Sequence, residues 1–481
     1  MRIPEKGMDR ETVFEKLESY RSNDLDWKAG RAFGYVFDAG KEAMEVGKEA
    51  FTRFMSENAL DPTVFPSLPR FENDIVSMAR EHLRGDENCV GTFTSGGTES
   101  IILAVKSARE YRRANRPTPG QAEIILPVTA HAAFHKAAHY LDLKVVLAPV
   151  DTTTYQADVA AMREAITENT ILLVGSSPSY AHGVIDPIEE MGQLAQEKDL
   201  LFHVDGCIGA FLLPFFKRLG ADIPDFDFQV PGVTSMSMDF HKYGFTPKGA
   251  SVVMYRNNEL RTHQYFACSH WTGYTIINPT IQSTKSGGPL AAAWAVMNYL
   301  GDDGYMELAQ KTHETATKLI EGIKKIDGLY IMGDPKMSLL AFRSDTIDIF
   351  HIIDEMNERG WYVQPQLRFK DYPENIHLSV NPGNHGGTEA FLKDLQDAVE
   401  AAKQLPPRQM EAAMGGQLAQ LEGVEMSHED IVGLLGMAGI ETGNKLPGRM
   451  AEINGLLNAL PPAFSEKVLN AFMGELFMPS K

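Results

Sequence analysis

The sequence predicts an α/β fold, with a mostly parallel sheet in a large domain and a smaller α+β domain after it. Two observations predict this architecture. Short apolar runs of strand length alternate with helix-length segments over residues 71–298, a pattern typical of βαβ crossovers and of a sheet covered on both faces. From residue 299 to residue 405 the strand-like and helical segments follow a mixed order, which indicates a separate α+β unit.

In the large domain, at 71–298, the strand-like runs are bounded by turn residues, and the helical segments carry apolar residues three and four positions apart. We expect strands at residues 122–127, 144–149, 171–175, 200–205, 233–238 and 250–255. We expect helices at residues 72–83, 100–113, 134–141, 158–166 and 188–198. Ligands of such sheets bind beyond the carboxyl ends of the strands, so residues at those ends are the first candidates for a site.

Three further parts flank this domain. Residues 1–70 are predicted to form an N-terminal helical arm and a Pro-containing loop, and residues 299–405 the C-terminal small domain. Residues 406–481 are predicted to form a helical C-terminal extension. Its apolar residues at helical spacing are Val432, Leu434 and Leu435, and then Ile453, Leu456, Leu457 and Leu460.

Composition excludes several classes of protein. A formal net charge of −19 over 481 residues argues against nucleic acid or an anionic membrane as a general partner. The three cysteines, Cys89, Cys207 and Cys268, have no CxxC spacing, so we expect no disulfide framework, no metal site and a cytoplasmic location. No apolar run reaches signal-peptide character or the roughly 20 residues of a membrane span, so we expect neither export nor a membrane segment.

A lysine that directly follows a histidine, at His241 and Lys242, comes where a strand-like run gives way to a Gly/Pro turn. Alone, such a lysine is more often a solvated surface residue. Three other features accompany it: the segment TSGGTE at 94–99, Asp205 at the end of a strand-like run, and His131. Together they supply an amine for a Schiff base, a carboxylate for a ring nitrogen and donors for a phosphate, which are the needs of pyridoxal 5′-phosphate.

Each feature also has a structural alternative. Segment 94–99 opens a helix whose N-terminus, glycines and hydroxyls favour phosphate, although it could be a Gly-containing cap without a ligand. Asp205 can keep a pyridine nitrogen protonated, or it can cap the turn that follows. His131 can stack on the ring and His241 can donate to the phosphate, whereas lone histidines are more often structural. We expect burial beside the ring to lower the pKa of Lys242, as a nucleophilic amine requires.

Taken in this order, the motifs resemble the pyridoxal-phosphate-dependent decarboxylases of group II, fold type I, and within them most resemble the sphingosine-1-phosphate lyases. The resemblance implies a large domain with a seven-stranded sheet, a smaller α+β domain, and a homodimer with shared active sites. The likeness covers about residues 27–405, at segments 58–66, 94–100, 130–134, 182–187, 203–205, 241–249, 278–280 and 287–288.

The resemblance also implies roles for individual residues. Lys242 would carry the cofactor, Asp205 would pair with the pyridinium and His131 would stack on the ring. Tyr180 would lie near the substrate as a proton donor. The residues that would hold the phosphate are Ser95, Gly97, Thr98 and His241, with Thr284 of the partner subunit.

Departures from the lyase pattern lie on the substrate side. Asp61 stands where the resemblance leads us to expect a histidine, and Phe37 and Ile276 stand where we expect tyrosines. An aspartate at a phosphate site opposes binding through like-charge repulsion and desolvation. Asn58 and Lys248 keep the pattern, so Asn58, Asp61 and Lys248 are the candidate substrate residues.

These departures lead us to predict a lyase that decarboxylates a small amino acid bound to the cofactor as a Schiff base. The alternative is an aldehyde-lyase that performs retro-aldol cleavage of a phosphorylated 2-amino alcohol, as the resemblance to the lyases implies. Transamination, and a non-catalytic protein of the same fold, rank below both, because Lys242, Asp205 and His131 are all present. The expected partners are a small amine or amino acid and a second copy of the chain.

Overall fold

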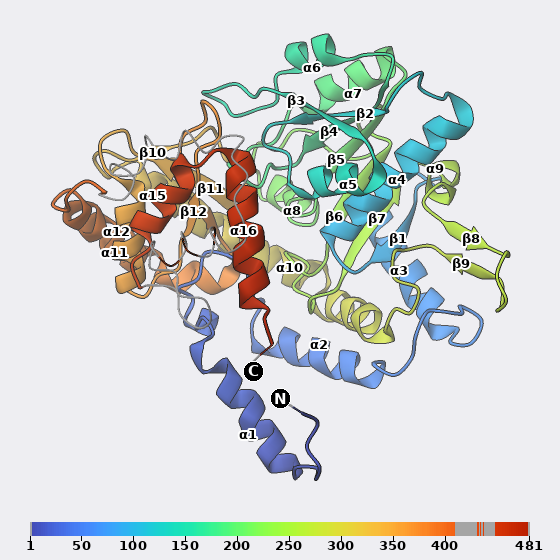
Figure 1. The fold of residues 1–481 in the computed structure, drawn as a ribbon, viewed down its shortest axis with the longest axis horizontal. Coiled ribbons are helices and arrows are strands. Elements are labelled where there is room, and N and C mark those ends of the chain that lie inside the picture. Colours follow the sequence, from blue (N-terminus) through green and yellow to red (C-terminus); the bar gives the residue numbers. More distant parts are fainter. Residues whose placement is uncertain (1, 409–430, 432, 434–435, 437–447, 480–481) are drawn as a thin grey trace.

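The computed structural model describes residues 2–408, 431, 433, 436 and 448–479. Its main layer is a 7-stranded sheet with the order β1-β7-β6-β5-β4-β2-β3 (Figure 1). Neighbours are parallel except that β7 lies antiparallel between β1 and β6. The predicted α/β class with a mostly parallel sheet is therefore confirmed. The strands are β1 Val90–Thr94, β2 Glu123–Pro127, β3 Lys144–Ala148, β4 Thr170–Ser176, β5 Leu201–Asp205, β6 Ser235–Asp239 and β7 Ser251–Tyr255.

Both faces of this sheet are buried, because the central strands are apolar at successive positions. In β2, Ile124 and Leu126 pack into one hydrophobic core while Ile125 packs into the other. In β4, Leu172 and Leu173 divide between the same two cores. The helices of this part of the chain are α3 Ser67–His82, α4 Gly97–Asn115, α5 Ala133–Leu141, α6 Val159–Ala165, α7 Ile188–Glu197, α8 Leu213–Arg218 and α9 Asn258–Thr262.

Strand β1 is not foreseen from the sequence, because its residues VGTFT lack an apolar run. It forms at the edge of the sheet through backbone pairing with β7. A second unforeseen feature is the hairpin of β8 Phe266–Cys268 and β9 Ile276–Asn278. It extends from the body of the molecule (Figure 1) and its turn carries the exposed side chains of Trp271 and Tyr274.

A long helix, α10 Gly287–Ile323, leads into the second unit. The helix is interrupted at Gly301, whose φ of 58° lies in the left-handed region that favours glycine. A 4-stranded antiparallel sheet follows, with the order β10-β11-β13-β12. Its elements are β10 Tyr330–Ile331, β11 Leu339–Arg343, α11 Ile349–Glu358, β12 Gln364–Gln366, β13 Asn375–Ser379 and α12 Thr388–Ala402.

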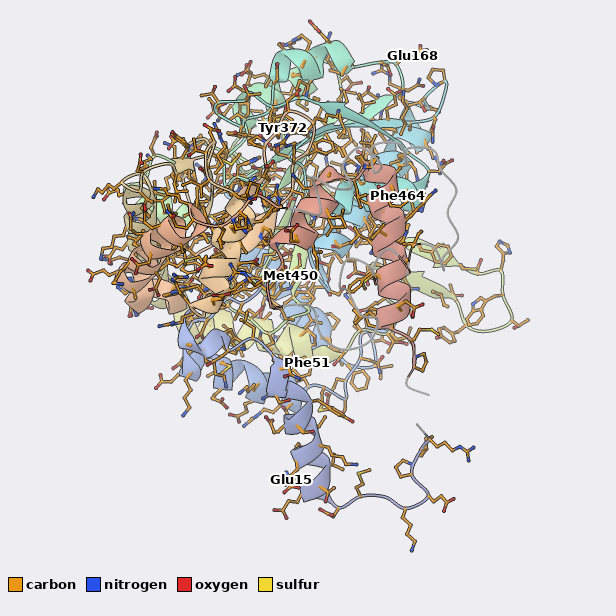
Figure 2. All side chains as sticks on the ribbon, turned by 60° about the vertical axis from the view of Figure 1, so that its left-hand side comes forward. Glu15, Phe51, Glu168, Tyr372, Met450 and Phe464 are labelled. Carbon is orange, nitrogen blue, oxygen red and sulfur yellow. The ribbon has the colours of Figure 1, made fainter. Side chains whose placement is uncertain are left out.

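The N-terminal arm contains two helices of different character. Helix α1 Arg10–Tyr20 has no buried residue and points away from the body in both overall views (Figures 1 and 2). Helix α2 Lys41–Arg53 packs against α10. Within the described ranges, no helix is both long and apolar enough to cross a membrane.

The C-terminal extension includes α15 Ala451–Ala459 and α16 Pro462–Leu476. Asp354 on α11 accepts hydrogen bonds from the backbone N–H groups of Met450 (2.7 Å) and Ala451 (3.0 Å), and it thereby caps the start of α15. The extension is thus docked on the small unit. The predicted helical positions Val432, Leu434 and Leu435 lie outside the described residues.

Candidate active site

A cavity of about 410 Å³ opens where β5 and β6 end and α4 begins. This is the edge at which the sheet topology predicts a ligand. The cavity brings together Lys242, Asp205, His131 and Tyr180 with the Gly-rich start of α4. Its lining residues are Ser95, Gly96, Gly97, Thr98, Glu99, Ile101, His131, Pro178, Tyr180, Asp205, Cys207, Ile208, Asp239, His241 and Lys242.

Lys242 extends into this cavity next to a carboxylate that had no predicted role. Its Nζ lies 3.0 Å from Asp239 Oδ2, and the Asp239 side chain is only 2% exposed. Burial by itself lowers the pKa of Lys242, but the charge of Asp239 outweighs burial and holds the pKa above the ordinary value of a lysine. The expectation of a lowered pKa for Lys242 is therefore wrong for the cofactor-free protein.

Asp205 ends β5 and is held by a chain of hydrogen bonds. Its Oδ1 accepts from the backbone N–H of Cys207 (3.0 Å) and from Ser237 Oγ (3.2 Å). Ser237 Oγ lies 3.3 Å from His203 Nε2, and Ser235 Oγ lies 2.9 Å from His203 Nδ1. Burial lowers the pKa of His203 to about 4, so this ring is neutral near pH 7. A fixed carboxylate of this kind suits a pyridinium N–H.

The start of α4 leaves donors for an anion. Its N-cap residue, Gly96, has no side chain that could cap the first N–H groups of the helix. A Cβ atom on Gly97 would lie 2.6 Å from Cys207 Sγ, so only glycine fits there. Ser95 is already engaged, because its N–H and Oγ both donate to Glu99 Oε2 at 2.7 and 2.8 Å. Gly-rich backbone at a helix N-terminus fits the phosphate of the expected cofactor.

His131 and Tyr180 lie on the other side of the cavity. The two rings are 6.3 Å apart and nearly perpendicular. His131 Nδ1 accepts from the backbone N–H of Ala133 (3.1 Å), which fixes the orientation of the ring. Tyr180 Oη donates to Gln364 Oε1 (2.6 Å) on β12, and its ring packs against His377 with the centroids 4.5 Å apart and the planes tilted by 31°. The small unit thus positions Tyr180 from a point far along the chain.

Lys248 lies just outside the cavity wall. Its Nζ donates to the carbonyl oxygens of Tyr35 (3.3 Å) and His241 (3.2 Å) and lies 5.0 Å from the centre of the Phe37 ring. The surrounding protein desolvates the ammonium group, and with the nearby charge of Lys242 this lowers the pKa of Lys248 to about 8.

Besides Lys248, three predicted residues are not part of the cavity wall within one subunit: Asn58, Asp61 and Thr284. Asp61 Oδ1 accepts from Thr63 N–H (2.8 Å) and Oγ1 (2.6 Å), so the carboxylate caps its own turn. Asn58 pairs through its backbone with Ser286, close in sequence to Thr284. These residues form one exposed or partly exposed edge, apart from Lys242.

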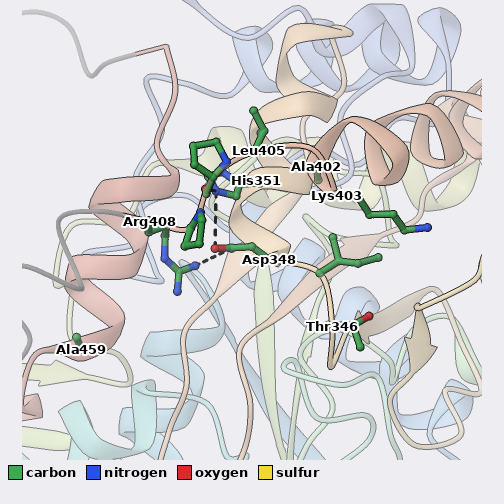
Figure 3. Close-up of a pocket in the computed structure, with 11 residues that line it drawn as sticks. Thr346, Asp348, His351, Ala402, Lys403, Leu405, Arg408 and Ala459 are labelled. Atoms are coloured by element: carbon green, nitrogen blue, oxygen red, sulfur yellow. Dashed lines mark hydrogen bonds and ion pairs between the residues drawn. The ribbon is translucent and has the colours of Figure 1, made fainter.

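A larger cavity, of about 630 Å³, lies elsewhere, between α11 and the segment after α12 (Figure 3). Three of its polar side chains are paired with one another, since Arg408 Nη1 lies 2.6 Å from Asp348 Oδ1 and His351 Nε2 lies 3.9 Å from Asp348 Oδ2. None of the predicted site residues lines it, so size does not identify the active site here.

The sequence motifs do not reveal Asp239, Gln364 or His377 as site residues. Asp239 is the one with a usable signal, because it lies three residues before Lys242, where an aspartate at a strand end must share an edge with Asp205. Gln364 and His377 have no local signal, since they reach Tyr180 only through the packing of the two units.

Comparison with known proteins agrees with this geometry. The pyridoxal-dependent decarboxylase conserved domain matches residues 4–345, and the pyridoxal-dependent enzyme C-terminal putative HTH domain matches residues 396–475. The sphingosine-1-phosphate lyase of Arabidopsis thaliana is 42% identical over 413 residues, which are 84% of this chain and 74% of that protein.

Solved structures give the same result. The sphingosine-1-phosphate lyase of Burkholderia pseudomallei K96243 superposes with a TM-score of 0.81 and 38% identity, over 88% of this chain and 97% of that one. The glutamate decarboxylase of Lactobacillus brevis has a TM-score of 0.75 at 19% identity, over 84% and 96%, and shows the shared fold alone. The predicted family, fold type and cofactor are thereby confirmed. This chain belongs to the pyridoxal-dependent decarboxylase family, and its cofactor is pyridoxal 5′-phosphate.

Proposed function

We propose that this chain is an aldehyde-lyase that cleaves the Cα–Cβ bond of a phosphorylated 2-amino alcohol. The observation that carries the proposal is the identity of 38% to 42% with sphingosine-1-phosphate lyases over 84% to 88% of the chain. The glutamate decarboxylase that shares the fold is only 19% identical. Decarboxylation of a small amino acid, which the substrate-side departures predict, has less support from these relatives.

The residues of the cavity fit the tasks that this reaction sets. When bound, pyridoxal 5′-phosphate supplies an electron sink for the bond that breaks. Lys242 would hold its aldehyde carbon, and the carboxylate of Asp205 would keep a proton on its ring nitrogen. His131 would orient the ring by stacking, while His241 and the N–H groups at Gly97 and Thr98 would bind the phosphate.

Proton transfer is the remaining task of the protein. Retro-aldol cleavage removes the proton of a β-hydroxyl group and later returns a proton to the α-carbon. Lys242 Nζ and Tyr180 Oη both face the cavity and can take part in these transfers. Burial raises the pKa of Tyr180, so its phenol holds its proton at neutral pH and is suited to donate it.

The same proposal includes a homodimer. Asn58, Asp61 and Thr284 match positions that the resemblance places at the active site, yet they stand apart from Lys242 within one subunit. A second subunit that contributes this edge would complete the site. Light scattering tests the dimer, for which we expect twice the 53.2 kDa of one chain; a monomer with full activity would exclude a shared site.

A cytoplasmic location also stays a proposal. It is supported by the three cysteines, Cys89, Cys207 and Cys268, all of which are free thiols. Fractionation of the native cells with an antibody to the chain would test it.

The reaction is tested by assaying the holoenzyme for two products at once. With sphingosine 1-phosphate or a shorter phosphorylated 2-amino alcohol we expect released aldehyde, and with a panel of amino acids we expect no carbon dioxide. Lys242→Ala should abolish the release of aldehyde. Carbon dioxide from an amino acid, without aldehyde from any phosphorylated amino alcohol, would instead establish the decarboxylase that Asp61 and Phe37 favour.

A further inference from the structure

Asp239 is a buried carboxylate in the candidate active site to which the proposed reaction assigns no task. The residue ends β6 and is 2% exposed. Its Oδ2 lies 3.0 Å from Lys242 Nζ and 3.6 Å from His241 Nε2. Its Oδ1 is buried and has no hydrogen-bond partner among the described residues. Burial of an ionised carboxylate with an unpartnered oxygen opposes folding, so favourable interactions elsewhere in the protein must offset this desolvation cost.

The neighbours of Asp239 hold it in one position. Its backbone N–H donates to Cys207 O (3.3 Å). A Cβ atom on Gly97 would lie 2.9 Å from both of its carboxylate oxygens, so the start of α4 packs directly against the carboxylate. Asp239 is therefore close to the amine of Lys242 and to two groups, Gly97 and His241, that are proposed to hold the phosphate.

We propose that Asp239 is the counter-ion of the Lys242 nitrogen, a positioning residue that keeps a proton and a positive charge on that nitrogen before and after it is joined to the cofactor. The joining reaction conserves this charge. The aldehyde oxygen leaves as water with two of the three protons of the ammonium group, a carbon–nitrogen double bond forms, and the third proton remains on nitrogen. The carboxylate of Asp239 thus faces a cation throughout.

Other charged groups around Lys242 do not replace Asp239. Asp205 is held by the backbone of Cys207 and by Ser237, where it suits the ring nitrogen, and Lys248 is itself a cation. The groups whose charge or proton acts on Lys242 are Asp239, Asp205, Cys207, His241, Lys248 and Tyr180. Only Asp239 has an oxygen within ion-pair distance of its nitrogen among the described residues.

This inference concerns how the cofactor is held, so it does not depend on which bond of the substrate breaks. Its test is a pH titration of the visible absorbance of purified holoenzyme, which reports whether the nitrogen that joins Lys242 to the cofactor carries a proton. With Asp239→Asn we expect the midpoint of this titration to fall by about 1–3 pH units, because the opposite charge is lost while burial remains. An unchanged midpoint would overturn the proposal.

Asp227→Asn is the matched control. Asp227 is also a buried carboxylate, with a side chain 2% exposed, but it pairs with Arg84 and does not line the cavity. Removing its charge should leave the midpoint within a few tenths of a pH unit. An equal shift in both variants would show that loss of any buried carboxylate, and not the charge beside Lys242, sets the titration, and would also overturn the proposal.

The wild-type protein provides a second test that does not depend on the folding of a variant. Cofactor-free chain is acetylated with acetic anhydride over a range of pH, and the modified lysines are located by peptide mass spectrometry. Lys248, with a pKa of about 8, should react at a lower pH than Lys242. If Lys242 reacts first, its nitrogen is not held as an ammonium by Asp239 and the proposal fails.

Discussion

Gly97 lies so close to Asp239 that a Cβ atom at residue 97 would stand 2.9 Å from both carboxylate oxygens. Gly97→Ala must therefore displace Asp239 or Cys207, whose Sγ would be 2.6 Å away. Overpacking of this kind costs about 1–3 kcal/mol. We expect the dissociation constant for pyridoxal 5′-phosphate to rise at least about tenfold, measured by equilibrium dialysis of the cofactor.

Gly96→Ala is the control for this prediction. At residue 96 the nearest atom to a Cβ would be His241 Cε1 at 3.4 Å, which is ordinary van der Waals contact. Its backbone is extended, a conformation that alanine adopts freely. Cofactor affinity should change less than about threefold. Equal losses in both variants would mean that any methyl group at this turn disturbs binding, whatever its distance from Asp239.

The two glycines show how far the sequence alone leads. The segment 94–99 predicts an anion site because glycines and hydroxyls precede a helix, and the structure places that turn beside Lys242. The segment does not predict which of its glycines tolerates a side chain. That tolerance depends on Asp239 and Cys207, which lie at the ends of two other strands. The hydroxyl of Ser95 is likewise taken by Glu99, a contact within the same turn that the motif does not disclose.

Tyr180→Phe should reduce kcat by about 10²–10⁴, with KM changed little, if its hydroxyl moves a proton in the reaction. The phenol is held by Gln364 at 2.6 Å and its ring packs against His377, so the ring of phenylalanine should keep the same place. Steady-state kinetics with the phosphorylated 2-amino alcohol measure both constants. A raised KM with unchanged kcat would instead assign Tyr180 to substrate binding.

Tyr372→Phe is a matched control for Tyr180→Phe. Tyr372 Oη bonds to both the N–H and the carbonyl oxygen of Val150, at 3.0 Å each, away from the cavity. Loss of the Tyr372 hydroxyl should lower the free energy of unfolding by about 1 kcal/mol and leave kcat as in the wild type. A similar fall in kcat for both variants would point to a general loss of structure.

His203 should make the protein sensitive to acid. Its ordinary pKa is about 6.5, and burial lowers the pKa in the folded chain to about 4. Between these values the unfolded chain binds a proton that the folded chain does not, so stability is complete above about pH 6.5 and falls as pH drops toward 4. The loss from this group is on the order of 3 kcal/mol over that window, seen by denaturant unfolding at several pH values.

His203→Asn should remove that part of the acid dependence, because asparagine does not titrate and can still hydrogen-bond to Ser235 or Ser237. His139→Asn is the control, since His139 is exposed on α5. If the two variants lose stability with equal steepness below pH 6.5, burial of His203 is not the cause.

The central strands of the sheet were easier to predict than its edge strand β1, for a physical reason. Strands such as β4 and β5 are buried on both faces, so their sequences are mainly apolar. Such runs can be recognised as buried strands from the sequence alone. Strand β1, with the sequence VGTFT, contains one glycine and two threonines, and it depends on its neighbours: Thr94 Oγ1 and Ser251 Oγ both bond to Ser100 Oγ, at 2.6 and 2.9 Å. The link from Tyr180 to Gln364 spans 184 residues, and no local pattern encodes it.

The last prediction concerns the substrate-side loop at Asp61. Its carboxylate caps a turn through Thr63, and the same hydrogen bonds hold its pKa below the ordinary value of an aspartate. If this loop lines the active site of the partner subunit, Asp61→His should add a donor for the substrate phosphate and lower KM about tenfold, the value of one charge-assisted hydrogen bond. Asp61→Asn keeps an acceptor for Thr63 and removes only the charge, so it should give a smaller gain. Unchanged KM in both variants would restrict Asp61 to capping its turn, and the phosphate would then depend on Lys248 and Asn58.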